Sequence, residues 1–505
     1  MRRLKIIINN IKYNAVSQIA AFLINLAVLP FIVFRSGAEV YGAYILVMTF
    51  TGYVGLMDMG VGGAAIKYIA EFSSKDDTKK VRDIISASFT FFVIVGIISA
   101  AMLFSLSFCF EFFFKVGSYN KLIIKQLFWV AAGASLFIWP GRIFEHCLQG
   151  YQRYDRFALN NIIFTLLSGA AAYFVFSLNL GIVFYLVTTS VLTVLKYTSA
   201  YCIVRSSLLK EGIEFPCFKK DVYILIFDFS FYTFLSSLAG VIIFNLDSII
   251  VGTFVSVAAV TVYNVGFSIQ QGLRMLNSLI GGPLFPAYAE MEGRREYEKQ
   301  KQLFFKGTKY VAFIFVPIVL ITIIFAKPFI VAWMGESFIM SVLPAQILLS
   351  FWLFNGILEI GSGILSAKGM VKIIFKLLFL NAVVNLLLSL ILVRSLGIIG
   401  VALGTSIPMI CIYFPLIMRH VFKVFKVTFK EYFDQVIKKN VPVCLFAVGI
   451  SFLIYALYPP RALWLVVLEM FAAYILTILA GYRFFFLEPE RKELQSIMGF
   501  KTQLL

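Results

Sequence analysis

A row of polar side chains interrupts one of the apolar segments of this chain. Asn264, Ser268, Gln271, Arg274 and Ser278 recur every three or four residues. At about 100° per residue of α-helix, these positions fall within an arc of about 120° on one face. The stripe predicts the wall of a water-filled cavity in which Arg274 meets an anionic group. The alternative is hydrogen bonding between helices by Asn, Ser and Gln, which does not account for the cation.

Ionisable residues are rare in the other apolar segments, where a charge costs at least roughly 2.5–3.5 kcal/mol. Asp58 stands in a glycine-rich stretch, residues 55–65, where an acid can bind a proton, pair with a base or cap a broken helix. We interpret Asp58, Asp247 and Glu359 as ion-coupling or gating residues, with ion pairing or interfacial anchoring as the alternative. Lys196 is interpreted as a second cation of the substrate cavity.

Further cations lie close to the ends of apolar segments on the side predicted to be cytoplasmic. They are Lys67, Arg142, Lys368 and Lys372. Each could meet a phosphate, and extension of the side chain to the lipid headgroups is the alternative for each. Lys67 follows the glycine-rich stretch directly, and we include it among the candidate substrate-binding residues.

Several kinds of chemistry are not indicated by the sequence. Neither GxxxxGK[ST] nor GxGxxG between strand and helix patterns occurs, so no nucleotide-driven step is expected. His146 and His420, the two histidines, are separate and are interpreted as structural. Asn381, Asn385 and Ser389 share one helix face and predict hydrogen bonds between helices. The six cysteines are single packing residues, and no metal or cofactor is predicted.

The elements that must position these residues are membrane helices. Of 505 residues, 61% are hydrophobic and 14% are charged, whereas soluble proteins have roughly 45–50% and 25%. Mean hydropathy is +0.91. Crossing a hydrocarbon core about 30 Å thick takes about 20 apolar residues. Fourteen segments meet this length, at approximately 13–34, 41–64, 84–110, 122–144, 157–177, 181–204, 224–252, 257–285, 310–332, 341–366, 377–393, 398–418, 441–458 and 462–486.

The distribution of Lys and Arg predicts the orientation of these segments. Of the 44 Lys and Arg residues, 35 fall on the side of the termini and 7 on the other side. Positive charge accumulates in cytoplasmic loops, so both termini are predicted to be cytoplasmic. The net charge of +18 therefore mostly reflects the membrane orientation of the chain. The cations on the cytoplasmic side are dispersed over eight short segments, so they predict no nucleic-acid-binding face. The loops on the other side are short.

A weak internal repeat predicts the domain organisation. Asn25 and Tyr44 of the first segment correspond to Asn245 and Tyr263 of the seventh, with similar flanking residues. Repeated halves that meet around a site at the midplane are a transporter design. We expect an N-lobe of six helices over residues 1–222 and a C-lobe of six over 223–420. Residues 421–505 then hold two additional helices and a cytoplasmic tail.

The glycine-rich stretch also carries a family resemblance. Residues 14–44, the run from Asp58 to Ala64, Lys67-Tyr68 and the run from Leu284 to Ala289 resemble the O-antigen type of polysaccharide-biosynthesis flippase, in the multidrug/oligosaccharidyl-lipid/polysaccharide exporter superfamily. The resemblance implies an all-α polytopic fold with two six-helix lobes in a V-shaped arrangement. It also implies alternating access to a central cationic cavity, driven by an ion gradient.

The function implied by the resemblance is translocation of an undecaprenyl-diphosphate-linked oligosaccharide across the bacterial inner membrane for O-antigen, capsule or exopolysaccharide synthesis. Arg274 would contact the diphosphate or an acidic sugar, and Asp58 or Asp247 would take part in gating. The partners would be membrane lipids and the glycan polymerase and glycosyltransferases of the pathway. Two alternatives remain open: a multidrug exporter of the same superfamily, and a membrane glycan polymerase or ligase, which would normally need a catalytic group on a longer external loop.

Overall fold

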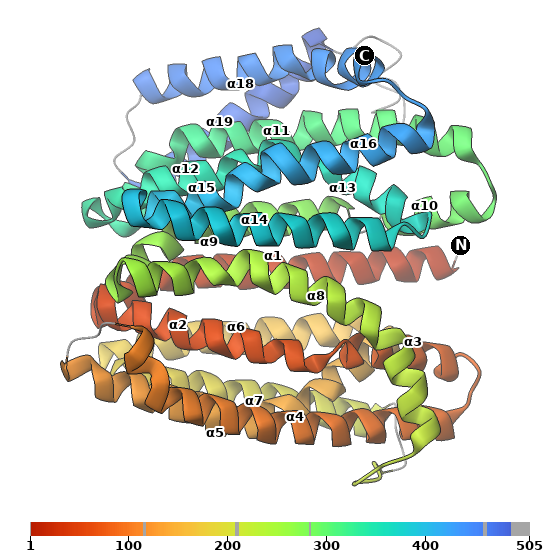
Figure 1. Ribbon diagram of the computed structural model, residues 1–505, viewed down its shortest axis with the longest axis vertical. Helices are drawn as coiled ribbons and strands as arrows, with labels where there is room; N and C mark the ends of the chain where they lie inside the picture. Colours follow the sequence, from red (N-terminus) through yellow and green to blue (C-terminus); the bar gives the residue numbers. More distant parts are fainter. Residues whose placement is uncertain (1, 115–117, 208–211, 282–283, 458–461, 486–505) are drawn as a thin grey trace. The chain divides into compact units, whose positions relative to one another are not determined.

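A computed structural model describes residues 2–114, 118–207, 212–281, 284–457 and 462–485 (Figure 1). Every regular element in these ranges is helical, which confirms the predicted all-α class. The described chain divides into two compact units. The first unit comprises Met1–Asn264 and Ser389–Val401, and the second comprises Val265–Leu388 and Ala402–Leu505.

The first unit is a bundle of long helices. Helix α4 lies along α5, α5 packs on α7, and α1 packs on α6; α8 contacts both α2 and α3 (Figure 1). The helices of this unit are α1 (Arg2–Ser36), α2 (Ala38–Val54), α3 (Val61–Ser73), α4 (Thr78–Phe113), α5 (Ser118–Gly150), α6 (Tyr154–Ser177), α7 (Gly181–Ser207) and α8 (Lys220–Phe254).

The second unit is organised around its longest helix, α11 (Tyr297–Met334), which packs on α13, α18 and α19. The aromatic ring of Phe313 meets Val443 of α18, and Phe325 packs with Val466 and Ala473 of α19. The remaining helices are α9 (Val257–Gly281, which starts in the first unit), α10 (Leu284–Gly293), α12 (Val342–Ser350), α13 (Trp352–Ala367), α14 (Val371–Leu396), α15 (Ile398–Pro408), α16 (Phe414–Phe425), α17 (Phe429–Tyr432), α18 (Lys438–Leu457) and α19 (Leu463–Ala480).

Twelve helical segments of the described chain are long and apolar enough to cross a membrane. They correspond to twelve of the fourteen predicted segments. The predicted segments 224–252 and 257–285 fall largely on α8 and α9, which are 35 and 25 residues long. The multi-pass fold is therefore confirmed, and fourteen is an approximate count of its spans. Helices α4 and α11, at 36 and 38 residues, extend well beyond the predicted apolar segments because helix continues into their polar ends.

Short non-α turns lie within or directly before several predicted segments. The segment 341–366 holds α12 and α13, and a 3-10 turn, η2 (Glu336–Ser341), leads into it. The segment 398–418 joins α15 to α16 through a π-helical turn, η3 (Met409–Tyr413), and a second π-helical turn, η4 (Phe433–Ile437), joins α17 to α18. Periodicity alone does not reveal such turns, because they preserve the apolar character of the segment.

The segment 41–64 contains a complete break. Helix α2 gives way to a 3-10 turn, η1 (Gly55–Asp58), and α3 starts at Val61. Met59 and Gly60 between them have φ values of 48° and 79°. This left-handed conformation ends the helical hydrogen-bond ladder, and Gly60 adopts it without a Cβ clash. The glycines of this stretch thus mark a real change of helix direction.

Candidate functional site

The polar stripe predicted on α9 lies on the more exposed face of that helix. Gln271, Arg274 and Ser278 are exposed, and Asn264 and Ser268 are half-buried. The opposite face carries Gly266, Gln270 and Asn277, all of which are buried. The stripe therefore occupies the side of α9 that is turned away from its buried face, which is where a cavity wall would have to be.

The buried face of α9 packs closely against a neighbouring helix. A Cβ on Gly266 would stand 3.0 Å from the carbonyl oxygen of Ser341 and 3.1 Å from the amide nitrogen of Ala345. The backbone of α9 therefore lies directly against the junction of η2 and α12. The sequence analysis did not single out the buried amides Gln270 and Asn277; their spacing of seven residues, two helical turns, was the available signal.

Asp58 caps the helix that follows the break. Its Oδ1 accepts a hydrogen bond of 2.8 Å from the backbone amide of Gly62, in the first turn of α3. That amide is one of those that a helix start leaves without an intrahelical partner, and a carboxylate there also meets the positive end of the helix dipole. The cap is one of the roles that the sequence left open for Asp58.

His146 of α5 faces Asp58 across the missing side chain of Gly62. A Cβ on Gly62 would stand 2.5 Å from His146 Nε2 and 3.1 Å from Asp58 Oδ2. Both ring nitrogens of His146 are shielded from solvent, and Asp58, Arg142 and Gln149 are the polar side chains around them. The prediction treated His146 as an isolated structural residue. Its partner lies far away in sequence, so spacing gave no signal of this pairing.

Lys196 is held by a partner that the sequence analysis did not consider. Its Nζ lies 3.0 Å from Oε1 of Glu145, and the two side chains are only 19% and 14% exposed. The same Nζ donates a hydrogen bond of 3.2 Å to Oδ1 of Asn161. The cation is thus already compensated within the first unit, and a substrate phosphate would have to compete with Glu145. We call Asp58, Arg142, Glu145, His146 and Lys196 the α5 polar cluster.

Lys67 lies on the exposed side of α3. Its Nζ is 4.6 Å from the ring centroid of Tyr68 and 3.5 Å from the hydroxyl oxygen of that residue. A cation above an aromatic face at this distance is attracted by the ring quadrupole, which orients the ammonium group and leaves it accessible. Lys67 thus remains a candidate for meeting a phosphate.

Asp247 is the most deeply buried acid among the candidates, at 1% exposure. Its Oδ2 accepts a hydrogen bond of 2.5 Å from the hydroxyl of Tyr263, which joins α8 to α9 within the first unit. Tyr53 of α2 lies close to Asp247, and a Cβ on Gly52 would stand 3.5 Å from Nδ2 of Asn245. The Asn245-to-Tyr263 motif of the predicted repeat therefore encloses a buried acid where α2, α8 and α9 meet.

Glu359 lies on the exposed side of α13 in the second unit. The tyrosines close to it are Tyr288 of α10 and Tyr413 of η3, and both are buried. Glu359 thus stands beside two phenolic groups. Asn385 of α14 donates a hydrogen bond of 3.1 Å to the hydroxyl of Thr405 in α15, which confirms interhelical bonding for this member of the predicted face. The side-chain amide of Asn381 and the hydroxyl of Ser389 are buried and make no hydrogen bond within the described residues, so the prediction was wrong for these two.

One of the predicted headgroup cations is bound in a different way. Lys368, at the end of α13, donates a hydrogen bond of 2.6 Å to Oε2 of Glu292 in α10. The same oxygen accepts a bond of 3.0 Å from the amide of Gln300 in α11, which is fully buried. This group ties the ends of three helices together, so Lys368 has a structural role in addition to any contact with lipid.

These residues stand in a chain whose family can be recognised. The sequence profile of the family described as polysaccharide biosynthesis protein matches residues 7–292. The chain belongs to this family. The match covers the polar cluster on α5, the break at Asp58 and the α9 stripe, and it confirms the resemblance derived from the glycine-rich stretch.

Two relatives extend the similarity to most of the chain. The Shigella flexneri protein named "Putative O-antigen transporter" is 24% identical over 408 residues, which is 80% of this chain and 95% of that protein. An uncharacterized membrane protein of Methanocaldococcus jannaschii is 24% identical over 384 residues, which is 72% of this chain and 73% of that protein.

Solved structures share the fold. The lipid II flippase MurJ in an inward closed conformation has a TM-score of 0.67 at 17% identity, and the match covers 93% of this chain and 99% of MurJ. An inward-facing multidrug transporter of the MATE family has a TM-score of 0.63 at 17% identity, covering 81% and 96%. At this level of identity the likeness establishes the fold, which is that of the superfamily named by the resemblance.

Proposed function

We propose that this protein is a flippase that translocates an undecaprenyl-diphosphate-linked oligosaccharide across the bacterial inner membrane, for O-antigen, capsule or exopolysaccharide synthesis. The observation that carries the proposal is the exposed polar stripe on α9, with Arg274 on it, in a chain of the polysaccharide biosynthesis family. The name of the Shigella flexneri relative supports an O-antigen intermediate as the substrate class.

The chemistry of the stripe suits a diphosphate. A guanidinium group offers paired N–H donors that match two phosphate oxygens, and this geometry gives both affinity and orientation. Gln271 and Ser268 on the same face would donate hydrogen bonds to the sugar or to the remaining oxygens. The polyprenyl chain is as apolar as the bilayer, so it can remain in lipid while only the polar headgroup crosses.

Ion coupling is assigned to the acids. Asp58 caps α3 at the break in the second predicted segment, so protonation would weaken the cap and alter the break between α2 and α3. Asp247 and Glu359 are the other candidates, each beside a buried tyrosine. An acid that binds a proton on one side of the membrane and releases it on the other links the gradient to alternating access.

The proposal includes a topology and a set of partners. Both termini are cytoplasmic, the lobes comprise residues 1–222 and 223–420, and residues 421–505 add two helices and a tail. The protein acts as a transporter and not as an enzyme, and it requires no cofactor. Its partners are the lipid-linked oligosaccharide, the surrounding lipids, and the glycan polymerase and glycosyltransferases of the same pathway.

The test is transport by purified protein in proteoliposomes that contain a fluorescent lipid-linked oligosaccharide. We expect protected substrate to become accessible, faster with an imposed pH gradient. Arg274→Ala should reduce the initial rate at least tenfold, and Arg274→Lys should retain part of it, because Lys keeps the charge but not the paired donors. Lys79→Ala, which removes an exposed cation at the start of α4, is the control and should transport normally. Absence of translocation with or without the gradient would contradict the proposal.

A multidrug exporter is the second candidate, because the MATE fold covers 81% of this chain at a TM-score of 0.63. A cavity for cationic drugs would be dominated by acids, whereas the exposed ionisable residue of the α9 stripe is a base. Expression in a drug-sensitive bacterium separates the two. Raised resistance to organic cations that disappears in Glu359→Gln and persists in Arg274→Ala would favour the exporter.

A further inference from the structure

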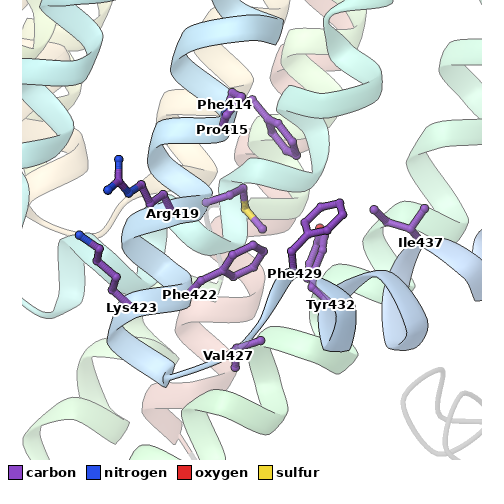
Figure 2. Close-up of a pocket in the computed structure, with 10 residues that line it drawn as sticks. Phe414, Pro415, Arg419, Phe422, Lys423, Val427, Phe429, Tyr432 and Ile437 are labelled. Carbon is purple, nitrogen blue, oxygen red and sulfur yellow. The ribbon is translucent and has the colours of Figure 1, made fainter.

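A pocket outside the candidate site lies where α16 ends and α17 begins (Figure 2). Its volume is about 470 Å³, within the range of pockets that hold small ligands. All of its walls belong to the second unit. They are formed by Phe414, Pro415, Met418, Arg419, Phe422, Lys423, Val427, Phe429, Tyr432 and Ile437.

The chain builds this pocket with a tight, well-bonded turn. Lys426 ends α16 in the left-handed conformation, with φ of 51°. The amide of Val427 then donates a bond of 2.9 Å to the carbonyl of Phe422. Thr428 and Glu431 form a capping box that starts α17. Because both sides of the turn are fixed by backbone and side-chain bonds, the pocket is a preformed feature of the fold.

The inner wall is anchored in the core. Tyr432 is 2% exposed, and its ring lies 5.8 Å from that of Phe304 in α11 and 5.3 Å from that of Phe422. The outer wall, in contrast, is exposed to the surroundings. Phe429 and Phe433 are 64% and 41% exposed, with ring centroids 6.3 Å apart. Figure 2 shows the Phe429, Phe422 and Tyr432 side chains that line the pocket.

The position of the pocket places it at the boundary between membrane and water. Candidate spans occupy Ile398–Phe425 and Phe429–Leu457, and the pocket is formed where they connect. The loop belongs to the side that the distribution of Lys and Arg predicts to be cytoplasmic.

One rim of the pocket is cationic. Arg419 and Lys423 are four residues apart on α16 and both are exposed. Figure 2 shows both side chains extending from the same side of the helix. Residues 419–440 contain six Lys and Arg against two acids, Glu431 and Asp434. Glu431 is occupied by the capping box, and no ion pair to Arg419 or Lys423 occurs within the part of the chain that the structure describes. The pocket thus combines an apolar interior with two uncompensated positive charges.

We infer that this pocket binds one anionic phospholipid of the leaflet that it faces. The phosphate lies between Arg419 and Lys423, and an acyl chain enters the pocket against Phe422, Phe429 and Tyr432. Basic residues beside a membrane span attract anionic headgroups. The apolar walls add the burial of acyl carbons, which a free phosphate could not provide. The site stands apart from the α9 stripe and does not depend on the transport activity proposed above.

The test is native mass spectrometry of the purified full-length chain, titrated in detergent with phosphatidylglycerol or with phosphatidylcholine of the same acyl chains. We expect tighter binding of phosphatidylglycerol. The double variant Arg419→Gln/Lys423→Gln should bind it about 30-fold more weakly, since each cation near a membrane surface contributes roughly 1 kcal/mol. Phe429→Ala should weaken both lipids, because it removes part of the apolar wall and no charge.

The chain offers controls for both changes. Lys79 and Lys80 are also exposed cations, at the start of α4, and they line no part of this pocket. Phe379 on α14 is exposed and ring-paired with Phe375, as Phe429 is with Phe433. Lys79→Gln/Lys80→Gln and Phe379→Ala should leave phosphatidylglycerol binding unchanged.

Three results would overturn the inference. The first is an equal loss of phosphatidylglycerol binding in the Arg419/Lys423 and Lys79/Lys80 double variants, which would reflect the total charge of the protein and not this pocket. The second is binding of phosphatidylcholine as tight as that of phosphatidylglycerol. The third is preferential binding of undecaprenyl phosphate that depends on Arg419 and Lys423, which would make the pocket a station for the substrate and not for a leaflet phospholipid.

Discussion

Asp58 shows how one side chain can have two separable roles. Its oxygen caps the first turn of α3, which is a local structural role, and its carboxylate faces His146 across Gly62, which is an electrostatic one. A proton that moves onto Asp58 would affect both at once. Because an amide can replace a carboxylate as an acceptor but cannot titrate, the two roles can be separated by substitution.

Asp58→Asn should keep the cap and lose the coupling. We expect thermal unfolding in detergent to change by less than about 0.5 kcal/mol, while transport no longer responds to an imposed pH gradient. Asp58→Ala removes the acceptor as well and should destabilise the fold by about 0.5–2 kcal/mol. If the Asn variant still responds to the gradient as the parent does, Asp58 has no part in coupling.

Lys196 poses a different question, because Glu145 already compensates its charge. Lys196→Met leaves Glu145 largely buried without its cation, and we expect a loss of about 1–3 kcal/mol in thermal stability. Combining it with Glu145→Met should restore most of that loss, because no charge is then left buried. If the double variant is stable and transports normally, Lys196 is structural. Loss of transport in this stable double variant would instead support the substrate role predicted from the sequence.

At the scale of elements, the helices approach one another where side chains are missing. A Cβ on Gly42 of α2 would overlap the backbone carbonyl of Val257, at the start of α9, and would also reach the hydroxyl of Thr261. That hydroxyl donates a hydrogen bond of 2.6 Å to the carbonyl of Ala38. The crossing of α2 and α9 is therefore fixed by backbone contact, as is common where membrane helices pack through small residues.

Gly42→Ala should disrupt this crossing. Backbone atoms cannot move aside as a flexible side chain can, so we expect a loss of about 1–3 kcal/mol in the free energy of unfolding. Gly63→Ala is the control, since a Cβ on Gly63 would meet nothing within 4 Å. It should be neutral or slightly stabilising, because Ala favours helix over Gly. Equal melting temperatures of the two variants would show that the α2–α9 crossing can adjust.

The helices of this protein can be predicted from its sequence more fully than the contacts between them. Apolar length predicts the helices well. The face of Asn381, Asn385 and Ser389 was predicted to bond other helices, and within the described residues this holds for Asn385 and not for Asn381 or Ser389. The glycines around Asp58 indicated the break in the second segment. Spacing could not reveal the partners of His146 and Lys196, since Asp58 and Glu145 lie on other helices and only the packing brings them close.

The loop that precedes α8 also has partners that spacing in the sequence does not reveal. Nζ of Lys219 lies 2.6 Å from Oδ1 of Asp83 and 3.2 Å from Oε2 of Glu214. These two carboxylates raise the pKa of the Lys219 ammonium, chiefly through the hydrogen bond to Asp83. The amide of Cys217 also donates to the hydroxyl of Thr90. The loop before α8 is thus bound along α4 by contacts between residues that lie far apart in the sequence.

At the scale of the whole molecule, the excess of positive charge makes a prediction about topology. Of 44 Lys and Arg residues, 35 are on the side assigned to the cytoplasm, and retention of Lys and Arg on that side determines insertion. Lys79 stands on this side, in the first turns of α4, and Asn179 stands in the short loop between α6 and α7 on the opposite side. Both are exposed, so each can report the side of the membrane that it faces.

Cysteine labelling of intact cells with a membrane-impermeant maleimide measures this directly. Asn179→Cys should react in cells whose outer membrane has been made permeable and whose inner membrane is intact. Lys79→Cys should react only after the inner membrane has also been made permeable. The unsubstituted chain serves as the background, because Cys147 and Cys217 are buried and the other four cysteines lie within candidate spans, out of reach of an aqueous reagent. The opposite labelling pattern would reverse the orientation. It would also place the cationic rim at Arg419 and Lys423 in the external leaflet. The topology of the chain therefore determines from which leaflet that pocket can bind a phospholipid.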